Sequence, residues 1–331
     1  MSHIVFDADA SYAVGVDVGG TKINAGIVDA RGEVLLTRSI ATQAAEREVP
    51  ERIILAVEAV IAEFGSTAAE AMQEAVRLKG IGVGTAGQVD WEQGSIRYSS
   101  GLIPGYGGTP LKRLLQERFG LPVWVDNDVN VLALTERTLG AGRGVSNLLC
   151  LALGTGVGGA AVIDGKLVHG TWGGAGEFGH LSVDFDGPPC VCGSRGCLEQ
   201  YASGTGIAKR MADKLAALGI TEPAIDARTT VDRWLDGDPA ASEVMRETFS
   251  ALGSAIASLI HTFNPEVIVI GGGVAEAGEA LLSEITREVS RRTMPSMLQG
   301  VKITPAYRGN WSGMIGAALQ VWAYEKTGTA S

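Results

Sequence analysis

The chain has 331 residues, of which 46% are hydrophobic and 19% are charged, which is enough apolar material for one large or two medium globular domains. Twenty-seven basic and 37 acidic residues give a net charge of −10, which opposes nonspecific binding to nucleic acid or anionic lipid and favours small-molecule partners. The sequence shows neither a cleavable leader nor a run of about 18 uncharged apolar residues, so we expect a cytoplasmic protein with no membrane partner.

The first half of the chain predicts a three-stranded meander followed by alternating helices and strands. Apolar runs separated by glycine-containing turns predict the strands, and apolar residues at helical spacing predict the helices. The predicted strands are 12–19, 22–29, 33–42, 81–83 and 122–125, and the predicted helices are 44–64 and 128–139.

The second half begins in the same way, with a strand over 148–154, a glycine-rich turn and a strand over 160–164. Gly154 lies 135 residues after Gly19, and Asp164 lies 135 residues after Asp29. We interpret this as an internal duplication that opens each of two α/β domains, placed at 12–140 and 141–331. A strand over 266–270, a helix reaching about residue 292 and a closing helix over 313–325 follow.

Glycines gather at three strand ends. The segment 17–22, Asp-Val-Gly-Gly-Thr-Lys, puts a carboxylate, bare backbone amides, a hydroxyl and an ammonium at one corner, and such a corner can cradle phosphate. Glycine-rich segments at 154–159 and 271–273 occupy similar corners, so the sequence predicts a nucleoside triphosphate. For the first corner alone, a tight hairpin with an exposed lysine is the alternative. The pattern G-x-G-x-x-G also occurs at 82–87 and 154–159, but no helix is predicted at the last glycine, which argues against a dinucleotide site.

Asn127 and Asp128 lie where a predicted strand ends and a helix begins. This position exposes a carboxylate at the carboxyl edge of the sheet, and the asparagine can bind a polyol hydroxyl. Asp128 is the candidate general base of a phosphoryl transfer. The alternative is that Asp126 or Asp128 caps the helix, and the two roles can coexist across two aspartates.

Three of the four cysteines and one of the four histidines lie within residues 177–199. Cys190, Cys192 and Cys197 with His180 form a possible tetrahedral Cys3His set for a structural zinc ion. A disulfide to Cys197 is the alternative. The carboxylates of Glu177 and Glu199 flank this Cys3His set. With a metal bound, they would lie close to the metal loop and could bind a ligand there, or they are simply solvated side chains of the loop.

The motifs DVGGTK, VDNDVN, GTGVGG, GEFGH, CVCGSRGCLEQYASG and GGGV occur in the order seen in ROK sugar kinases, and the chain resembles that family from about residue 13 to about residue 319. The resemblance implies an α/β fold of the duplicated actin-like type (ASKHA, RNase H-like), with two domains around a cleft. It also implies ATP-dependent phosphorylation of a hexose, usually at the 6-hydroxyl, with Mg²⁺. A structural zinc ion on His180, Cys190, Cys192 and Cys197 and a homodimer are further implications of the resemblance.

Carried over to this sequence, the family pattern makes Asp128 the general base. The implied sugar ligands are Gly87, Asn127, Asp128, Glu177, His180 and Glu199. His180 would serve both metal and sugar, because zinc on one ring nitrogen leaves the other for a hydroxyl. The implied nucleotide and phosphate residues are Asp17, Gly19, Gly20, Thr21, Lys22, Gly154, Thr155, Gly156, Gly271 and Gly272.

The identity of the sugar depends on smaller signals. Many relatives place Asn-Leu before a Pro-Gly-Trp segment, whereas residues 99–106 here read Ser-Ser-Gly-Leu-Ile-Pro-Gly-Tyr. The segments VWVDND and DGPPCVCGS are similar to N-acetylmannosamine kinases, and GCLEQYASG is similar to bacterial glucokinases. We predict glucose as the substrate, with N-acetylmannosamine or N-acetylglucosamine as the alternative. The motifs do not distinguish ATP from polyphosphate as the phosphoryl donor. Sugar-binding repressors of the ROK family carry an extra N-terminal helix-turn-helix, whereas only about a dozen residues precede the first predicted strand here and the chain is acidic. We therefore expect an enzyme and not a repressor.

Overall fold

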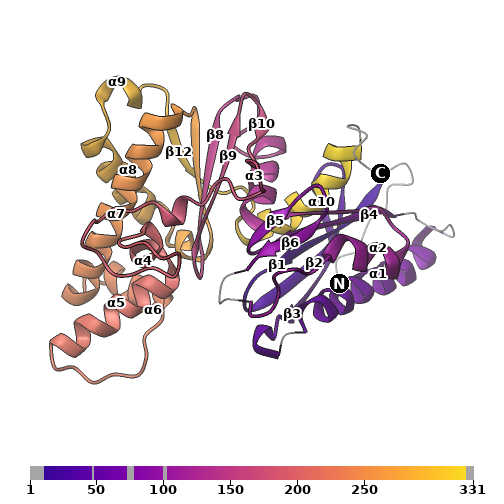
Figure 1. The fold of residues 1–331 in the computed structure, drawn as a ribbon, viewed down its shortest axis with the longest axis horizontal. Coiled ribbons are helices and arrows are strands. Elements are labelled where there is room, and N and C mark those ends of the chain that lie inside the picture. The colour runs from indigo at the N-terminus through magenta and orange to yellow at the C-terminus, as the bar shows by residue number, and fades with distance from the viewer. Residues whose placement is uncertain (1–10, 47, 73–77, 100–102, 326–331) are drawn as a thin grey trace. The chain divides into compact units, whose positions relative to one another are not determined.

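The computed structural model describes residues 11–46, 48–72, 78–99 and 103–325. These residues divide into two compact units, which we describe separately (Figure 1). The first unit takes its described residues from within Met1–Gly140, His169–Ala175 and Trp311–Ser331, and the second takes them from Ala141–Val168 and Gly176–Asn310. Within the described part of the chain, no helix has the length and apolar character needed to cross a membrane.

A five-stranded mixed sheet forms the centre of the first unit, in the order β3-β2-β1-β4-β7. The first three strands form an antiparallel meander, and β4 and β7 extend the sheet parallel to β1. The strands are β1 (Tyr12–Val18), β2 (Lys22–Asp29), β3 (Val34–Ala41), β4 (Leu78–Thr85) and β7 (Val123–Asn127). Because β1, β4 and β7 are parallel, their carboxyl ends meet at one edge of the sheet.

Helices cover both faces of this sheet. Valines of β1 pack into one apolar core with α1 (Val49–Met72), while the intervening small residues face α10 (Ser312–Glu325) on the other side. A Cβ on Gly15 would lie 2.2 Å from the carbonyl oxygen of Met314, and a Cβ on Gly82 would lie 1.7 Å from that of Ala317. These two glycines therefore let the α10 backbone lie directly against the sheet.

The remaining elements of the first unit are shorter. Two strands pair in a separate antiparallel hairpin, and α3 packs against α10. The elements are η1 (Ala44–Glu46), β5 (Gln88–Asp90), β6 (Ser95–Tyr98), α2 (Leu111–Phe119) and α3 (Asp128–Thr138).

The second unit repeats the sheet topology, in the order β10-β9-β8-β11-β12. Its strands are β8 (Leu148–Leu153), β9 (Val157–Ile163), β10 (Lys166–Leu167), β11 (Val267–Gly271) and β12 (Lys302–Pro305). Its helices are η2 (Phe178–His180), α4 (Leu198–Ala202), α5 (Gly204–Ala217), α6 (Ala227–Leu235), α7 (Pro239–Phe263), η3 (Gly273–Ala277), α8 (Glu279–Arg292) and α9 (Pro295–Leu298), with η4 (Gly309–Trp311) where the chain returns to the first unit. The long helix α7 contacts α4, α5, α6 and α8, and one large apolar core joins these helices to β8 and β11.

The strand orders confirm the predicted duplication. Strands β1, β2, β3, β4 and β7 correspond in position and direction to β8, β9, β10, β11 and β12. Residues 19–21 join β1 to β2, and residues 154–156 join β8 to β9. The glycine turns predicted to be equivalent therefore occupy the same place in the two sheets.

Two segments of the predicted second domain pack with the first unit instead. Apolar residues of α10 join Ala13 and Val28 of the first sheet in a common core, and His169 bonds to Asp126. Both placements come from contacts between residues far apart in the chain.

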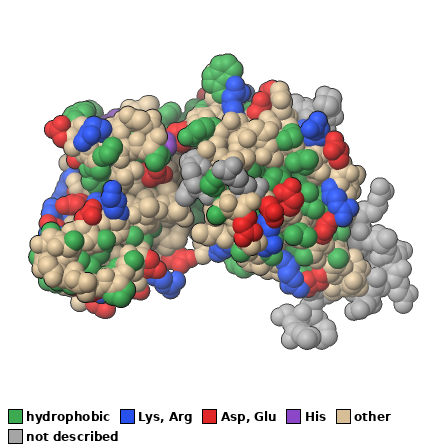
Figure 2. All heavy atoms as spheres, turned by 60° about the horizontal axis from the view of Figure 1, so that its bottom comes forward, with side chains coloured by type: hydrophobic (Ala, Val, Ile, Leu, Met, Phe, Trp, Pro, Cys, Tyr) green, Lys and Arg blue, Asp and Glu red, His purple; other side chains and the backbone are tan. Residues whose placement is uncertain are grey.

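On the face drawn in Figure 2, the described acidic and basic side chains are interspersed and form no continuous basic surface.

Candidate active site

Asp128 is the first residue of α3, directly after β7 ends. Its side chain is partly buried, and its Oδ1 accepts a hydrogen bond from the backbone N–H of Val129 at 3.0 Å. Because a helix N-terminus favours negative charge, this position stabilises the ionised carboxylate that a general base needs.

Asn127 is the residue that caps α3, in place of the Asp126 or Asp128 cap considered from the sequence. Its Oδ1 accepts from the backbone N–H of Val129 at 2.9 Å and of Asn130 at 3.3 Å. Asparagine caps well because its side-chain oxygen satisfies N–H groups that have no partner in the first turn. The residue at the cap position is therefore Asn127 and neither of the two aspartates.

Gly87 lies beside Asn127, whose Nδ2 donates to the Gly87 carbonyl oxygen at 3.0 Å. Gly87 has φ +102°, and a Cβ there would lie 2.5 Å from the carbonyl oxygen of Tyr98. Only glycine fits this combination of backbone conformation and space. The first unit thus brings together the three residues of the first half of the chain that are predicted to bind the sugar. The segment 99–106 departs from the pattern of many ROK relatives, and its residues 100–102 lie outside the described residues.

The β1–β2 corner of the same unit has Asp17 at the end of β1 and Lys22 at the start of β2. The turn of Gly19, Gly20 and Thr21 closes through a bond from the Gly19 N–H to the carbonyl oxygen of Lys22 at 3.0 Å. Burial raises the pKa of Asp17 to about 7, and the Asp128 carboxylate also raises it, against the lowering effects of Asn24 and Lys22. The predicted base and the predicted phosphate corner are therefore electrostatically coupled.

In the second unit the β8–β9 turn lies beside the end of β11. Gly271 pairs with Ala152 of β8, and a Cβ on Gly272, which has φ +87°, would lie 2.5 Å from the carbonyl oxygen of Leu153. The carbonyl oxygens of Gly154 and Thr155 accept hydrogen bonds from the start of α5. The structure thus gathers Gly154, Thr155, Gly156, Gly271 and Gly272 at one corner.

Glu199 belongs to this corner through its carboxylate. Its Oε2 accepts from the backbone N–H of Val157 at 3.0 Å, and a Cβ on Gly156 would lie 2.5 Å from the same oxygen. Glu199 lies in the first turn of α4, two residues after Cys197. A predicted sugar ligand therefore touches a predicted nucleotide turn.

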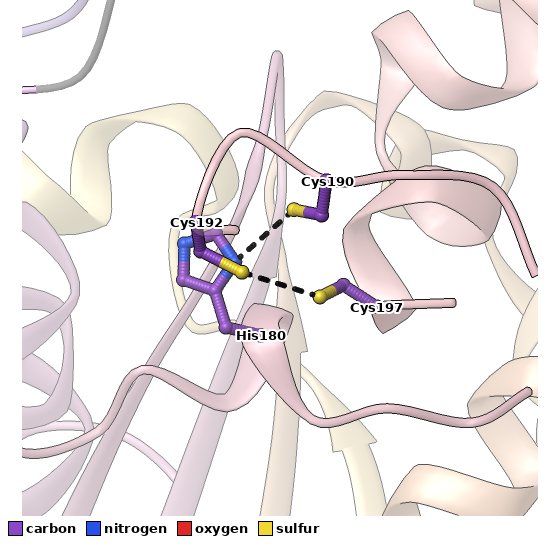
Figure 3. Close-up of side chains that lie close together, drawn as sticks. All are labelled: His180, Cys190, Cys192 and Cys197. Atoms are coloured by element: carbon purple, nitrogen blue, oxygen red, sulfur yellow. Dashed lines mark hydrogen bonds between the residues drawn. The ribbon is translucent and has the colours of Figure 1, made fainter. Parts of the chain in front are cut away.

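The four cysteine and histidine side chains face one another (Figure 3). One ligand atom from each of His180, Cys190, Cys192 and Cys197 lies within 4.8 Å of the others, and all four cysteines of the chain are free thiols. Cys190 Sγ lies 3.6 Å from His180 Nδ1, and Cys192 Sγ lies 3.5 Å from Cys197 Sγ. The free thiols argue against the disulfide alternative.

The local backbone explains this convergence. His180 ends η2, Cys197 precedes α4, and bridges from Ser182 to Cys197 and from Pro189 to Arg195 fold the loop on itself. Burial, followed by the neighbouring Cys192 and Cys190, raises the pKa of the Cys197 thiol to about 12. A cation among the sulfurs would offset that cost by stabilising thiolates.

The ring of His180 presents its two nitrogens to different partners. Nδ1 faces Cys190, and Nε2 lies 4.0 Å from Glu177 Oε2. The dual role predicted for His180 requires two ring nitrogens with separate neighbours, and the role itself stays a prediction. The predicted sugar ligands thus form two groups, with Gly87, Asn127 and Asp128 in the first unit and Glu177, His180 and Glu199 in the second.

His169 and Trp91 lie outside the motifs recognised in the sequence. His169 Nε2 lies 2.7 Å from Asp126 Oδ2, and its ring stacks on Trp91. The rarity of histidine, with four in the chain, was the available signal, but the partner of His169 lies 43 residues away in sequence.

Known proteins resemble this chain over nearly its whole length. A sequence model of the ROK family matches residues 13–323. A glucokinase from Halalkalibacterium halodurans is 37% identical over an alignment of 332 residues, with 96% of this chain and 96% of that protein covered.

Two solved structures extend the likeness to the fold. A ROK family glucokinase from Streptomyces griseus in complex with glucose and AMPPNP has 34% identity and a TM-score of 0.80, over 93% of this chain and 98% of that one. A putative N-acetylmannosamine kinase from Listeria monocytogenes has 26% identity and a TM-score of 0.75, over 95% and 99%. The predicted actin-like fold is confirmed by these matches, and the chain belongs to the ROK family.

Proposed function

We propose that the chain catalyses the ATP-dependent phosphorylation of glucose at its 6-hydroxyl. The main support for this proposal is the similarity, over nearly the whole chain, to the Streptomyces griseus glucokinase whose structure contains glucose and the ATP analogue AMPPNP. The similarity to the glucokinase from Halalkalibacterium halodurans supports the same activity. We assign individual residues of this chain to the steps of that reaction.

Asp128 is the proposed general base. Its carboxylate takes the proton of the sugar 6-hydroxyl while the bond from that oxygen to the γ-phosphorus forms. The bond from the γ-phosphorus to its bridging oxygen breaks, so that glucose 6-phosphate and ADP leave. The position of Asp128 at the start of α3 supports this role, because the N-terminal end of a helix favours a negatively charged side chain.

The remaining site residues divide by chemistry. We assign Gly87, Asn127, Glu177, His180 and Glu199 to the sugar hydroxyls, since they offer carbonyl, amide, carboxylate and imidazole groups. The β1–β2 corner with Asp17 and Lys22, the β8–β9 turn and the Gly271–Gly272 end of β11 are assigned to the nucleotide. When bound with ATP, Mg²⁺ would neutralise charge on the transferring phosphoryl group.

We assign a structural zinc ion to His180, Cys190, Cys192 and Cys197. Bonds of about 2.3 Å from zinc to sulfur in a tetrahedron place ligand atoms about 3.8 Å apart. The four atoms already lie within 4.8 Å of one another, and two of their contacts measure 3.6 and 3.5 Å. Zinc on Nδ1 of His180 would fix the ring and leave Nε2 for a sugar hydroxyl.

Two properties of the whole protein accompany this assignment. We propose a homodimer, as the family resemblance implies, and light scattering coupled to gel filtration would measure the mass. Because ATP is the phosphoryl donor, we place the reaction in the cytoplasm, and cell fractionation would test that location.

N-acetylmannosamine is the alternative substrate, favoured by the likeness to the putative N-acetylmannosamine kinase from Listeria monocytogenes. The two sugars differ at the second carbon, and the same phosphoryl transfer serves both. ADP release should therefore be measured with glucose, mannose, fructose, N-acetylglucosamine and N-acetylmannosamine, using zinc-loaded protein with ATP and Mg²⁺. The highest kcat/KM with glucose supports the proposal, a preference for an N-acetyl sugar selects the alternative, and no turnover with any sugar contradicts both.

A further inference from the structure

Asp126, which directly precedes the Asn127-Asp128 pair, has both carboxylate oxygens engaged. Oδ1 accepts from the backbone N–H of Asn127 at 2.7 Å and from Asn130 Nδ2 at 2.8 Å. Oδ2 lies 2.7 Å from Nε2 of His169. The Asp126 side chain is only 3% exposed, and a buried carboxylate is costly unless hydrogen bonds compensate it. His169 supplies the bond on the oxygen that the turn itself does not use.

The imidazole of His169 is held in place by its own neighbours. Its side chain is 10% exposed and stacks on the indole of Trp91, with ring centroids 4.4 Å apart and an interplanar angle of 16°. Trp91 follows β5 and also lies 6.1 Å from the ring of Tyr324 on α10. In the tautomer that carries its proton on Nε2, the imidazole donates a hydrogen bond to the Asp126 carboxylate.

The segment His169–Ala175 joins the first unit although the chain on either side belongs to the second. This segment packs against the β5–β6 hairpin. A Cβ on Gly173 would lie 1.9 Å from the carbonyl oxygen of Val89, so the two backbones are in close contact. The guanidinium of Arg97 lies 4.9 Å from the ring centroid of Trp172. Glu177, a proposed sugar ligand, follows two residues after the segment ends.

We propose that His169 is a positioning residue for the phosphoryl transfer. Its bond to Asp126 holds the β7–α3 turn in the conformation that presents the Asp128 carboxylate to the attacking hydroxyl. This inference rests on the proposed function and adds a residue to it. Without His169, Oδ2 of Asp126 loses its partner in a buried place, and the turn that carries Asp128 must adjust. A shift of about 1 Å in a reacting group costs about 100-fold in rate.

The test compares His169→Leu, which removes the donor, with His169→Gln, whose amide can still donate to Asp126. His261→Leu is the matched control, because His261 Nε2 accepts a single hydrogen bond, from the Met294 N–H in the second unit. For His169→Leu we expect kcat to fall at least about tenfold, with KM for ATP within about twofold of wild type. His169→Gln should recover most of kcat, and His261→Leu should stay within about twofold of wild type.

Hydrogen exchange gives a readout that does not depend on activity. We expect faster exchange in His169→Leu over residues 123–131, with no change there in His169→Gln. Wild-type kcat in His169→Leu, or unchanged local exchange, overturns the inference. A wild-type protein that phosphorylates no sugar counts against the proposed function instead.

A double-mutant cycle separates positioning from general destabilisation. Asp126→Asn keeps an acceptor for the Asn127 N–H and changes only the other end of the link. If His169 acts through Asp126, His169→Leu should lower kcat less in the Asp126→Asn background than in wild type. Equal losses in both backgrounds overturn the proposal. If His169→Leu does not fold, His169→Asn, whose amide is too short to reach Asp126, replaces it in the cycle.

Discussion

The carboxylates of Asp17 and Asp128 repel one another at the edge of the first sheet where the parallel strands β1 and β7 end. Burial is the larger cause and this repulsion the second in raising the pKa of Asp17 from 3.8 to about 7. The Asn24 side chain and the Lys22 ammonium oppose the shift. A cation or a phosphoryl group arriving at this corner therefore meets a carboxyl group that is only partly ionised near neutral pH.

This shift predicts how stability changes with pH. The folded-state pKa of Asp17 lies above its unfolded value, so the stabilisation is fully present below pH 3.8 and is lost as the pH rises through about 7. Asp17→Asn removes this contribution to the pH dependence of stability. The unfolding free energy of the variant minus that of wild type should therefore increase from about pH 5 to about pH 8, by on the order of 2 kcal/mol once partial solvent screening is allowed for. Urea unfolding of metal-free protein measures this, and a difference that does not change with pH contradicts it.

Asp128→Asn tests the proposed base directly. The amide cannot take the proton of the sugar hydroxyl, but it keeps the size of the side chain at the start of α3. We expect kcat to fall by about 1,000-fold with the protein folded and glucose still bound. Calorimetric titration with glucose and a coupled assay for ADP measure the two effects. Asp213→Asn, an exposed change on α5, is the control, and near-normal turnover in Asp128→Asn removes Asp128 from the mechanism.

Local patterns in the sequence predicted the parts of the site that are local in the chain. The Cys3His set spans 18 residues from His180 to Cys197, and the β1–β2 corner spans six, so spacing and residue type were sufficient. The link from His169 to Asp126 and the bond from the Val157 N–H to Glu199 join residues 43 and 42 positions apart. Such contacts depend on tertiary packing, which periodicity does not encode. The return of α10 to the first sheet was missed for the same reason, since its apolar surface fits either core by composition alone.

Gly156→Ala should affect function more than stability. A Cβ at Gly156 would lie 2.5 Å from Glu199 Oε2, and this flexible side chain can move away at little cost. The move displaces the carboxylate from the Val157 N–H and from any sugar hydroxyl that it binds. We expect KM for glucose to rise about tenfold, with the melting temperature within about 2 °C of wild type.

Gly154→Ala is the matched control for this change, because a Cβ there would lie 3.9 Å from its nearest neighbour, the Gly156 carbonyl oxygen. It alters the same turn without touching Glu199. An equal rise in KM for glucose in both variants would show that the turn, and not Glu199, determines sugar affinity.

Cys192→Ser should couple metal loss to sugar binding. The hydroxyl is a poor zinc ligand, so the site loses one of four donors, and the exposed Cys192 can be replaced without opening a core cavity. The loop then no longer fixes the His180 ring or the start of α4, where Glu199 lies. We expect bound zinc to fall from about one ion per chain to near none and KM for glucose to rise at least about tenfold, with a smaller change in KM for ATP. Cys150→Ala changes the cysteine buried in β8, outside the cluster, and should keep its zinc. Metal analysis by mass spectrometry alongside steady-state kinetics measures both quantities. A zinc-free variant with unchanged affinity for glucose would mean that the four ligands hold the loop for stability alone, and that Glu177 and Glu199 are positioned by their own helical turns.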